Sequence, residues 1–318
     1  MFSELPQARV RVVCDQRPER LREIGPRFPG VGLAAGVDEA LAAYGVDAAV
    51  ICTPATAHYD TICQCLEAGK HTLVEKPMTT QRDHAEEVID LAASRGLLLM
   101  VGHTFLYNAG IRALKACVDA DRVGRVYYLH SRRTNLGPVR QDVDALWDLA
   151  PHDISIFNYL LEDTPAWVSA VGGRVLGNCR EDVGFISLGY PGGVVAHIHV
   201  SWADPNKIRE VAVVGSGGRL VFDDLNSAAP VRVFTRDAGA TGNGSVTSPR
   251  VEASEPLKNQ CRHFLECAAQ GRPPLTCGRA GLEVVRIMEA IDRSVENNGT
   301  PVELEEDLCG RLTQPFAT

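Results

Sequence analysis

The sequence lacks a long run of charge of either sign, and acidic residues outnumber basic ones. Lys plus Arg is 32 and Asp plus Glu is 40, which gives the 318-residue chain a formal net charge of −8. Nucleic acids and anionic membrane surfaces attract basic proteins, so this balance argues against both as partners. Small anionic substrates remain compatible with it, because a local group of arginines can bind them within an acidic protein.

The sequence also has no apolar run near the ~20 residues that span a bilayer, and its N-terminus has no signal-peptide core. Its ten cysteines are scattered and include no C-x-x-C pair. Several of them sit within apolar patterns, which is typical of reduced cysteines in a protein core. The pattern therefore predicts a cytoplasmic protein with no zinc or other metal site.

The first hundred residues alternate between short apolar runs and helical patterns. Strands are expected at 8–14, 47–52, 72–74 and 97–101, and helices at 18–28, 38–44, 56–68 and 81–95. Such alternation predicts right-handed βαβ units around a parallel sheet. We therefore expect a Rossmann-like α/β dinucleotide-binding domain over residues 1–103.

The remaining residues follow a different pattern, which predicts an α+β domain over 104–318. Helices are expected at 108–120, 151–161, 256–270 and 279–297, and strands at 125–134 and through most of 167–234, with turns at 172–173, 191–193 and 215–218. Residues 237–254 are rich in Gly, Ser and Thr and predict a surface loop. This pattern favours a large, mostly antiparallel sheet, with the helix at 279–297 packing back on the first domain.

The stretch Glu75-Lys76-Pro77 comes directly after a buried strand. Pro77 cannot donate to a sheet ladder, so the strand must end there. Ligands bind at the carboxyl ends of parallel strands, and a lysine desolvated at such a place can donate or accept a proton near neutral pH. The alternative is a solvated Glu–Lys pair at a strand end.

Two further strand ends carry candidate cofactor ligands. Asp15 could accept hydrogen bonds from an adenosine ribose, or could simply cap the helix that begins at Pro18. Arg17 is close enough to meet a 2′-phosphate, so NADP is a candidate beside NAD. Residues 53–58 include Thr53, Pro54 and His58, and could hold a ribose or a pyrophosphate. A plain strand-to-helix turn explains the Thr-Pro pair equally well.

A third group surrounds Pro151, which we expect at the first position of a helix. His152 would then lie in the first turn, where the helix dipole favours a neutral imidazole that can accept a proton. Asp148 lies four residues before His152 in the sequence. The alternative is that His152 is structural and that Asp153 only stabilises the helix start.

These motifs together resemble the Gfo/Idh/MocA family of sugar oxidoreductases. The resemblance is carried by Glu75-Lys76-Pro77 after a βαβ unit and by Asp-x-x-x-His at Asp148 and His152, and it extends from about residue 2 to 304. Further stretches fit the same family: Cys14-Asp15, Thr53-Pro54 with His58, 67–71, Gly102-His103, Trp202 and the turn at 213–218. Residues 146–153 are similar to members from polysaccharide and sugar-antibiotic pathways.

The resemblance implies hydride transfer between NAD or NADP and a ring carbon of a sugar or nucleotide sugar. Lys76 would bond the reacting oxygen, His152 would relay the proton, and Asp148 would position substrate and His152. Glu75 would hold the nicotinamide ribose, and the Lys76–Pro77 bond would be cis. The remaining implied contacts, to cofactor or substrate, come from His103, Tyr107, Asn108, Arg133 and Arg140. A homo-dimer or homo-tetramer is implied as well.

The sequence departs from the family in one respect. No G-x-G-x-x-G precedes Asp15, and the glycines at 215–218 read as a hairpin turn. The first strand and Gly-rich loop of the dinucleotide fold are thus absent from the sequence as written. A misassigned start and a real loss both explain this. Two other functions therefore stay open: a redox-silent sugar-binding or regulatory relative, and a lyase, isomerase or hydrolase with the same acid/base residues.

Overall fold

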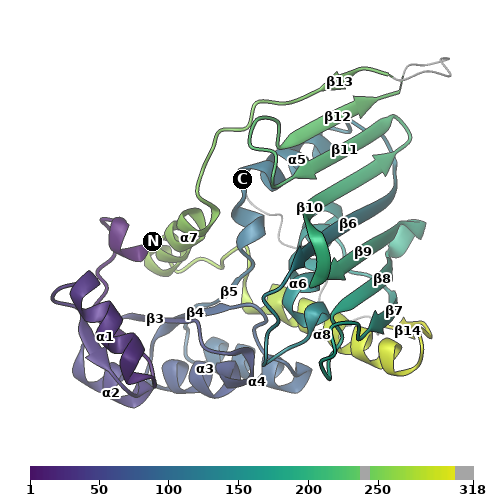
Figure 1. Cartoon of the computed structure of the whole chain (residues 1–318). Coiled ribbons are helices and arrows are strands. Elements are labelled where there is room, and N and C mark those ends of the chain that lie inside the picture. Colours follow the sequence, from purple (N-terminus) through teal and green to yellow (C-terminus); the bar gives the residue numbers. More distant parts are fainter. Residues whose placement is uncertain (237–243, 305–318) are drawn as a thin grey trace. The chain divides into compact units, whose positions relative to one another are not determined.

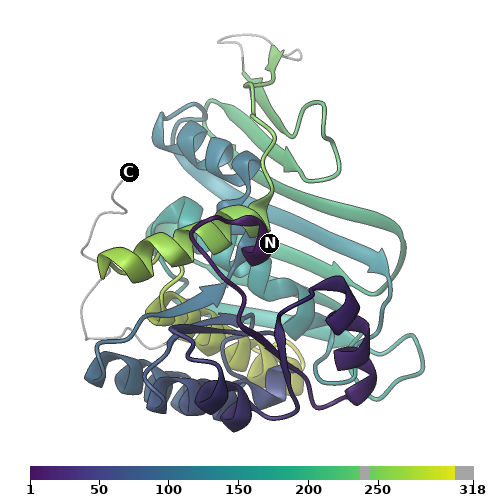
Figure 2. The ribbon, with the colours of Figure 1, turned by 90° about the vertical axis from the view of Figure 1, so that its left-hand side faces the viewer.

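A computed structural model describes residues 1–236 and 244–304 of the chain (Figures 1 and 2). These residues form two compact units. Unit 1 comprises residues 1–102 and 257–282, and unit 2 comprises residues 103–256 and those from 283 onward. The expected loop at 237–254 falls partly outside the described residues, at 237–243. Within the described ranges, no helix is long and apolar enough to cross a membrane.

Unit 1 contains the expected alternation of strands and helices. Its elements are β1 (Val12–Cys14), α1 (Pro18–Arg27), β2 (Gly32–Ala34), α2 (Val37–Ala43), β3 (Ala48–Ile51), α3 (His58–Glu67), β4 (His71–Glu75), α4 (Arg82–Ser94) and β5 (Leu99–Gly102), with short 3₁₀ turns at Phe2–Glu4 and Ala55–Ala57. β1 pairs with β2, and β4 lies between β3 and β5; all of these pairs are parallel. The predicted parallel βαβ architecture is confirmed.

The core of unit 1 lies between β3–β4–β5 and the helices α3 and α4, which run along the sheet in Figure 1. Ile62 of α3, Val74 of β4 and Val88 of α4 are fully buried there. The two helices end as the sequence predicts, because Gly69 and Gly96 have φ angles of 74° and 63°. This left-handed conformation is easy for glycine and terminates a helix. The helix ends thus feed the chain directly into β4 and β5.

A segment from the end of the chain completes unit 1. Helix α7 (Pro256–Gln270) has the predicted bounds, and α8 (Gly278–Glu296) begins within unit 1. Thr276 forms two hydrogen bonds with Val101 of β5: the Val101 N–H donates to the Thr276 carbonyl at 2.8 Å, and the Thr276 hydroxyl donates to the Val101 carbonyl at 2.6 Å. A Cβ at Gly281 would meet Val101 at 2.6 Å, so glycine permits the close approach of α8.

Unit 2 is built on one large sheet. Its elements are a 3₁₀ turn (Thr104–Tyr107), α5 (Ala109–Asp119), β6 (Val126–Leu136), α6 (Ala145–Leu161), β7 (Trp167–Gly173), β8 (Val183–Gly189), a 3₁₀ turn (Pro191–Gly193), β9 (Val195–Ser201), β10 (Ala203–Gly215), β11 (Gly218–Asp223), β12 (Val231–Thr235), β13 (Val246–Thr247), β14 (Val302–Glu303) and most of α8. The strand order is β13-β12-β11-β10-β6-β9-β8-β7-β14, and of these neighbours only β6 and β9 are parallel. The expected large, mostly antiparallel sheet is confirmed.

In unit 1 the strand predicted at 8–14 is shorter, at Val12–Cys14, and the sequence pattern does not predict β2; in unit 2 two local predictions are wrong. Helix α6 begins at Ala145, six residues before the predicted start, because Asp144 caps it by accepting a hydrogen bond from Trp147 N–H at 2.8 Å. Pro151 therefore lies inside the helix. The second error concerns Gly172 and Gly173, which form no turn but pair with β8 as the last residues of β7. Glycine fits at 172 because a Cβ there would meet the Glu181 side chain at 2.5 Å.

Candidate active site

The carboxyl end of β4 carries Glu75 and Lys76, both only partly exposed, and the Lys76–Pro77 bond is cis as the family resemblance implies. Burial raises the pKa of the Glu75 carboxyl, while the adjacent Lys76 ammonium acts in the opposite direction. Gly102 of β5 is the register partner of Glu75. A Cβ at Gly102 would lie 3.0 Å from Glu75 Oε2, so this carboxylate rests directly on the glycine backbone.

At the end of β1, the Asp15 carboxylate is bound by Arg17. The Arg17 Nε and Nη2 donate to the two carboxylate oxygens at 3.0 and 2.9 Å, and the Arg17 backbone N–H donates at 2.9 Å. These hydrogen bonds lower the pKa of Asp15 to about 2, so it is ionised at neutral pH. A carboxylate at this strand end can accept hydrogen bonds from ribose hydroxyls.

His58 is the first residue of α3 and is 1% exposed. Its Nδ1 lies 2.7 Å from the Pro77 carbonyl, and its Nε2 lies 2.9 Å from the Thr53 carbonyl. Thr53 and Pro54, in contrast, are exposed at the end of β3. The structure thus presents the Thr-Pro pair to solvent and commits both ring nitrogens of His58 to main-chain oxygens.

In unit 2, Asp148 and His152 lie on one face of α6, because residues four apart in a helix are neighbours on its surface. His152 is the eighth residue of the helix and not in its first turn, so the dipole argument for a neutral imidazole does not apply to it. The residue in the first turn is Asp148. Pro151 is buried inside the helix, where proline cannot donate a backbone hydrogen bond to the preceding turn.

The Asp148 carboxylate is held from two sides. Arg140 Nη1 donates to one oxygen at 3.0 Å, and Trp202 Nε1 donates to the other at 3.2 Å. Arg140 also forms a two-bond ion pair with Asp142, at 2.9 and 2.6 Å. The predicted substrate arginine Arg140 is therefore an immediate partner of the predicted catalytic Asp148.

A second chain of contacts leads from His152 to the sheet. The Phe105 ring meets the His152 ring edge-on, with centroids 5.1 Å apart, and the Arg133 guanidinium lies 4.3 Å from the centroid of the same Phe105 ring. Arg133 Nε and Nη2 donate to Asp153 at 3.1 and 2.9 Å, and both partners are buried. In this structure Arg133 is thus committed to Asp153 and 4% exposed, and its contact with a substrate stays a prediction.

Three other candidates lie around the 3₁₀ turn at Thr104–Tyr107. His103 and Tyr107 are 2% and 1% exposed, and the Arg112 guanidinium lies 5.6 Å from the Tyr107 ring centroid. Asn108 caps α5, since its Oδ1 accepts from Gly110 N–H at 2.8 Å. Their contacts with cofactor or sugar stay predictions.

The sequence motifs do not predict which side chains hold the candidates, although Trp202 is among the residues that fit the family. Trp202 and Asp142 fix Asp148 and Arg140, while Phe105 connects His152 with Arg133. Trp202 comes 54 residues after Asp148, and only sheet pairing brings it back to α6. The Asp142 contact is the one that spacing could have suggested, because it is two residues from Arg140.

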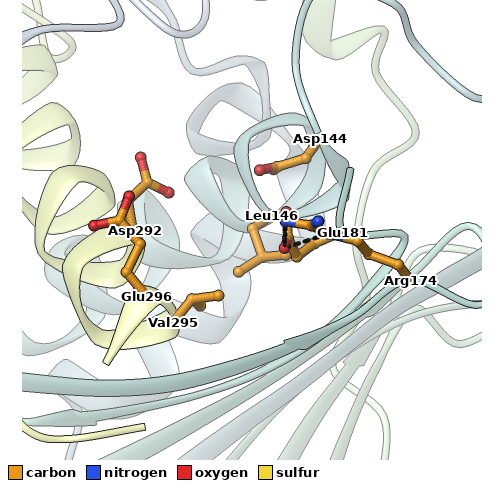
Figure 3. Close-up of a pocket in the computed structure, with 7 residues that line it drawn as sticks. All are labelled: Asp144, Leu146, Arg174, Glu181, Asp292, Val295 and Glu296. Atoms are coloured by element: carbon orange, nitrogen blue, oxygen red, sulfur yellow. Dashed lines mark hydrogen bonds and ion pairs between the residues drawn. The ribbon is translucent and has the colours of Figure 1, made fainter. Parts of the chain in front are cut away.

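A pocket of about 220 Å³ lies beside the start of α6, and it contains none of the predicted site residues (Figure 3). It is lined by Asp144, Leu146, Arg174, Glu181, Asp292, Val295 and Glu296. Burial raises the pKa of Asp144 to about 6 and that of Asp292 to about 7. Trp147 Nε1 donates to both oxygens of Asp292, at 2.9 and 3.1 Å, so the pocket adjoins the helix that carries Asp148.

The residues of unit 1 fit the two ribose groups of a nicotinamide dinucleotide. Asp15 offers an ionised acceptor at the end of β1, and the Glu75 carboxyl offers a second acceptor where the absence of a Cβ at Gly102 leaves room for it. Residues 1–14 contain no glycine, so these residues supply no Gly-rich turn for the pyrophosphate. The fit to the cofactor therefore depends on Asp15 and Glu75, at the carboxyl ends of β1 and β4.

Two family models match the chain. Residues 1–103 match the model described as oxidoreductase family, NAD-binding Rossmann fold, and residues 111–221 match the Gfo/Idh/MocA C-terminal domain. The UDP-N-acetylglucosamine 3-dehydrogenase of Acidithiobacillus ferrooxidans is 27% identical over 293 residues, 89% of each chain. The scyllo-inositol 2-dehydrogenase (NAD⁺) of Bacillus subtilis is 24% identical, and the alignment covers 96% of this chain and 91% of that enzyme.

A solved structure of similar fold is that of GenD2 from gentamicin A biosynthesis, in complex with NAD. It superposes on this chain with a TM-score of 0.82 at 26% identity, and the superposition covers 96% of this chain and 91% of the GenD2 chain. Sequence models and fold thus point to one family.

Proposed function

Because the chain belongs to the Gfo/Idh/MocA family of oxidoreductases, we propose that it transfers a hydride between NAD and a ring carbon of a sugar or nucleotide sugar. The observation that carries this proposal is the Glu75–Lys76 pair at the carboxyl end of β4, within the domain that matches the NAD-binding model. Relatives over most of the chain's length are dehydrogenases of a nucleotide sugar and of a cyclitol, which supports this substrate class.

A bound nicotinamide would supply or accept the hydride, and the chain's own residues would handle the proton and the oxygen. Hydride can leave a carbinol carbon only as the hydroxyl proton is accepted, so the reaction needs a base and a cation that stabilises the oxygen. We assign the cation to Lys76 and the proton relay to His152. Asp148, fixed by Arg140 and Trp202, would hold a substrate hydroxyl and keep His152 oriented.

For the cofactor, NAD is favoured over NADP. The Asp15 carboxylate can accept a hydrogen bond from the 2′-hydroxyl of an adenosine ribose and repels a 2′-phosphate, and its pKa of about 2 keeps it charged at neutral pH. Arg17 could offset that repulsion, but in this structure its guanidinium is paired with Asp15. Glu75 would bond the nicotinamide ribose.

Lysine substitution tests the proposal. Lys76→Met is compared with Lys70→Met, a lysine outside the proposed machinery, with NAD and either UDP-N-acetylglucosamine or scyllo-inositol as substrate. Loss of an oxyanion-stabilising donor typically lowers kcat about 100- to 1,000-fold. We expect such a loss for Lys76→Met only, with the melting temperature unchanged. Turnover within a few-fold of the parent would overturn the role of Lys76.

A further inference from the structure

His58 connects the ends of two neighbouring strands. Its Nε2 meets the carbonyl of Thr53, which follows β3, and its Nδ1 meets the carbonyl of Pro77, which follows β4. β3 and β4 are paired in parallel, so the imidazole lies across their shared carboxyl edge. At 1% exposure, the ring is enclosed by protein on all sides.

Both contacts lie next to groups with a proposed role. Pro77 directly follows Lys76, so fixing the Pro77 carbonyl restricts the backbone from which the Lys76 side chain extends. Thr53 belongs to the exposed turn at residues 53–54, a candidate for holding a ribose or a pyrophosphate, which we call the cofactor turn. A carbonyl oxygen only accepts hydrogen bonds, so the two contacts together require a hydrogen on each ring nitrogen, and the planar imidazolium holds these two donors at fixed directions. One rigid ring thus sets the position of two turns.

We propose that His58 is a positioning residue, which orients Lys76 through Pro77 and the cofactor turn through Thr53, and that its ring does not contact the cofactor. This inference rests on the proposed function of Lys76. The two contacts are separable: the Nδ1 contact serves catalysis, and the Nε2 contact serves cofactor binding.

Two amide variants separate the contacts. In His58→Asn the amide nitrogen replaces Nδ1 and keeps the bond to Pro77, whereas in His58→Gln it replaces Nε2 and keeps the bond to Thr53. Misplacement of a reacting group by about 1 Å can cost about 100-fold in rate. We expect His58→Gln to lower kcat about 10- to 100-fold with NADH affinity within about 3-fold, and His58→Asn to weaken NADH binding with kcat within about 3-fold.

A second measurement needs no turnover. The chain has five lysines, so protein labelled with ¹³C at lysine Cε gives five signals, and Lys76 is assigned from the Lys76→Met variant. The Lys76 signal should move in His58→Gln and stay in His58→Asn. The control is His84→Gln, because His84 stacks on the Tyr59 ring at 3.9 Å within the same unit and has no proposed role.

The results separate the two proposals. An unmoved Lys76 signal in both His58 variants would overturn the positioning role. In the wild type, ring ¹⁵N signals of His58 that shift on addition of NADH would also overturn it, because they would show direct contact. A wild type that neither binds NADH nor turns over would refute the proposed function, while a moved Lys76 signal in His58→Gln would still support the positioning role.

Discussion

Asp292→Asn should stabilise the protein, and more so at higher pH. The Asp292 carboxyl lines the pocket beside the start of α6. Its pKa is raised from 3.8 to about 7, because burial and the nearby Asp144, Glu296 and Glu181 carboxylates disfavour its charge. The hydrogen bond from Trp147 acts in the opposite direction. A carboxyl with a raised pKa in the folded state binds its proton more tightly there than in the unfolded chain. Stability therefore falls as pH rises from about 4 to about 7, and is level above that.

The size of this effect follows from the shift. At about 1.4 kcal/mol per pKa unit, the raised pKa of Asp292 lowers the stability of the fold by on the order of 4 kcal/mol at pH 8 and by about 1 kcal/mol at pH 4.5, relative to a side chain that stays neutral in both states. The neutral amide keeps an acceptor for Trp147 Nε1 but loses a charge-assisted bond, which offsets about 1 kcal/mol. We expect a net gain of about 3 kcal/mol at pH 8 and almost none at pH 4.5.

Scanning calorimetry at pH 4.5, 6 and 8 measures this difference. At about 2 °C per kcal/mol for a large domain, the melting temperature should rise by about 6 °C at pH 8. Glu252→Gln is the control, since it makes the same carboxylate-to-amide change at an exposed position of the same unit. A variant that is no more stable at pH 8, or equally stabilised at all three values, would refute this reasoning.

Three further substitutions test other parts of the structure. Gly102→Ala places a methyl group 3.0 Å from Glu75 Oε2 and should raise the KM for NAD about 10-fold in initial-rate assays, while an unchanged KM would remove Glu75 from the cofactor site. Asp153→Asn leaves the Arg133 charge buried and should cost about 3–5 kcal/mol in urea denaturation; a loss under 1 kcal/mol would contradict this. Asp15→Ser should shift the ratio of NADH to NADPH affinity toward NADPH, and a constant ratio would exclude Asp15 as the selector.

Local patterns in the sequence predict the helices and strands, but not the distant residues that cap them or pack against them. α7 could be predicted to the residue because its amphipathic pattern begins at Pro256 and ends before Gly271. The start of α6 could not, because Pro151 has the appearance of a first helical residue. In fact the cap is Asp144, and tertiary packing overrides the low helix propensity of the proline.

In the candidate site too, local sequence patterns predict where a residue lies but not which distant group it contacts. The positions of Lys76 and Glu75 at a strand end follow from the apolar run and from Pro77, both of which are local in the sequence. The contacts of His58 with Pro77 and of Asp148 with Trp202 span 19 and 54 residues. Which backbone or side-chain group completes such a contact depends on strand order and register, which periodicity does not specify.

Binding of the nicotinamide dinucleotide tests most directly the central claim that this chain is an NAD-dependent oxidoreductase. The 318-residue chain, and any longer form that its gene encodes, is titrated with NADH and with NADPH, and fluorescence follows the binding. The proposed function predicts micromolar affinity for NADH and weaker affinity for NADPH, and Asp15→Ser as a matched variant should lose this preference. Absence of NADH binding by every form would contradict the assignment of this chain as an NAD-dependent oxidoreductase.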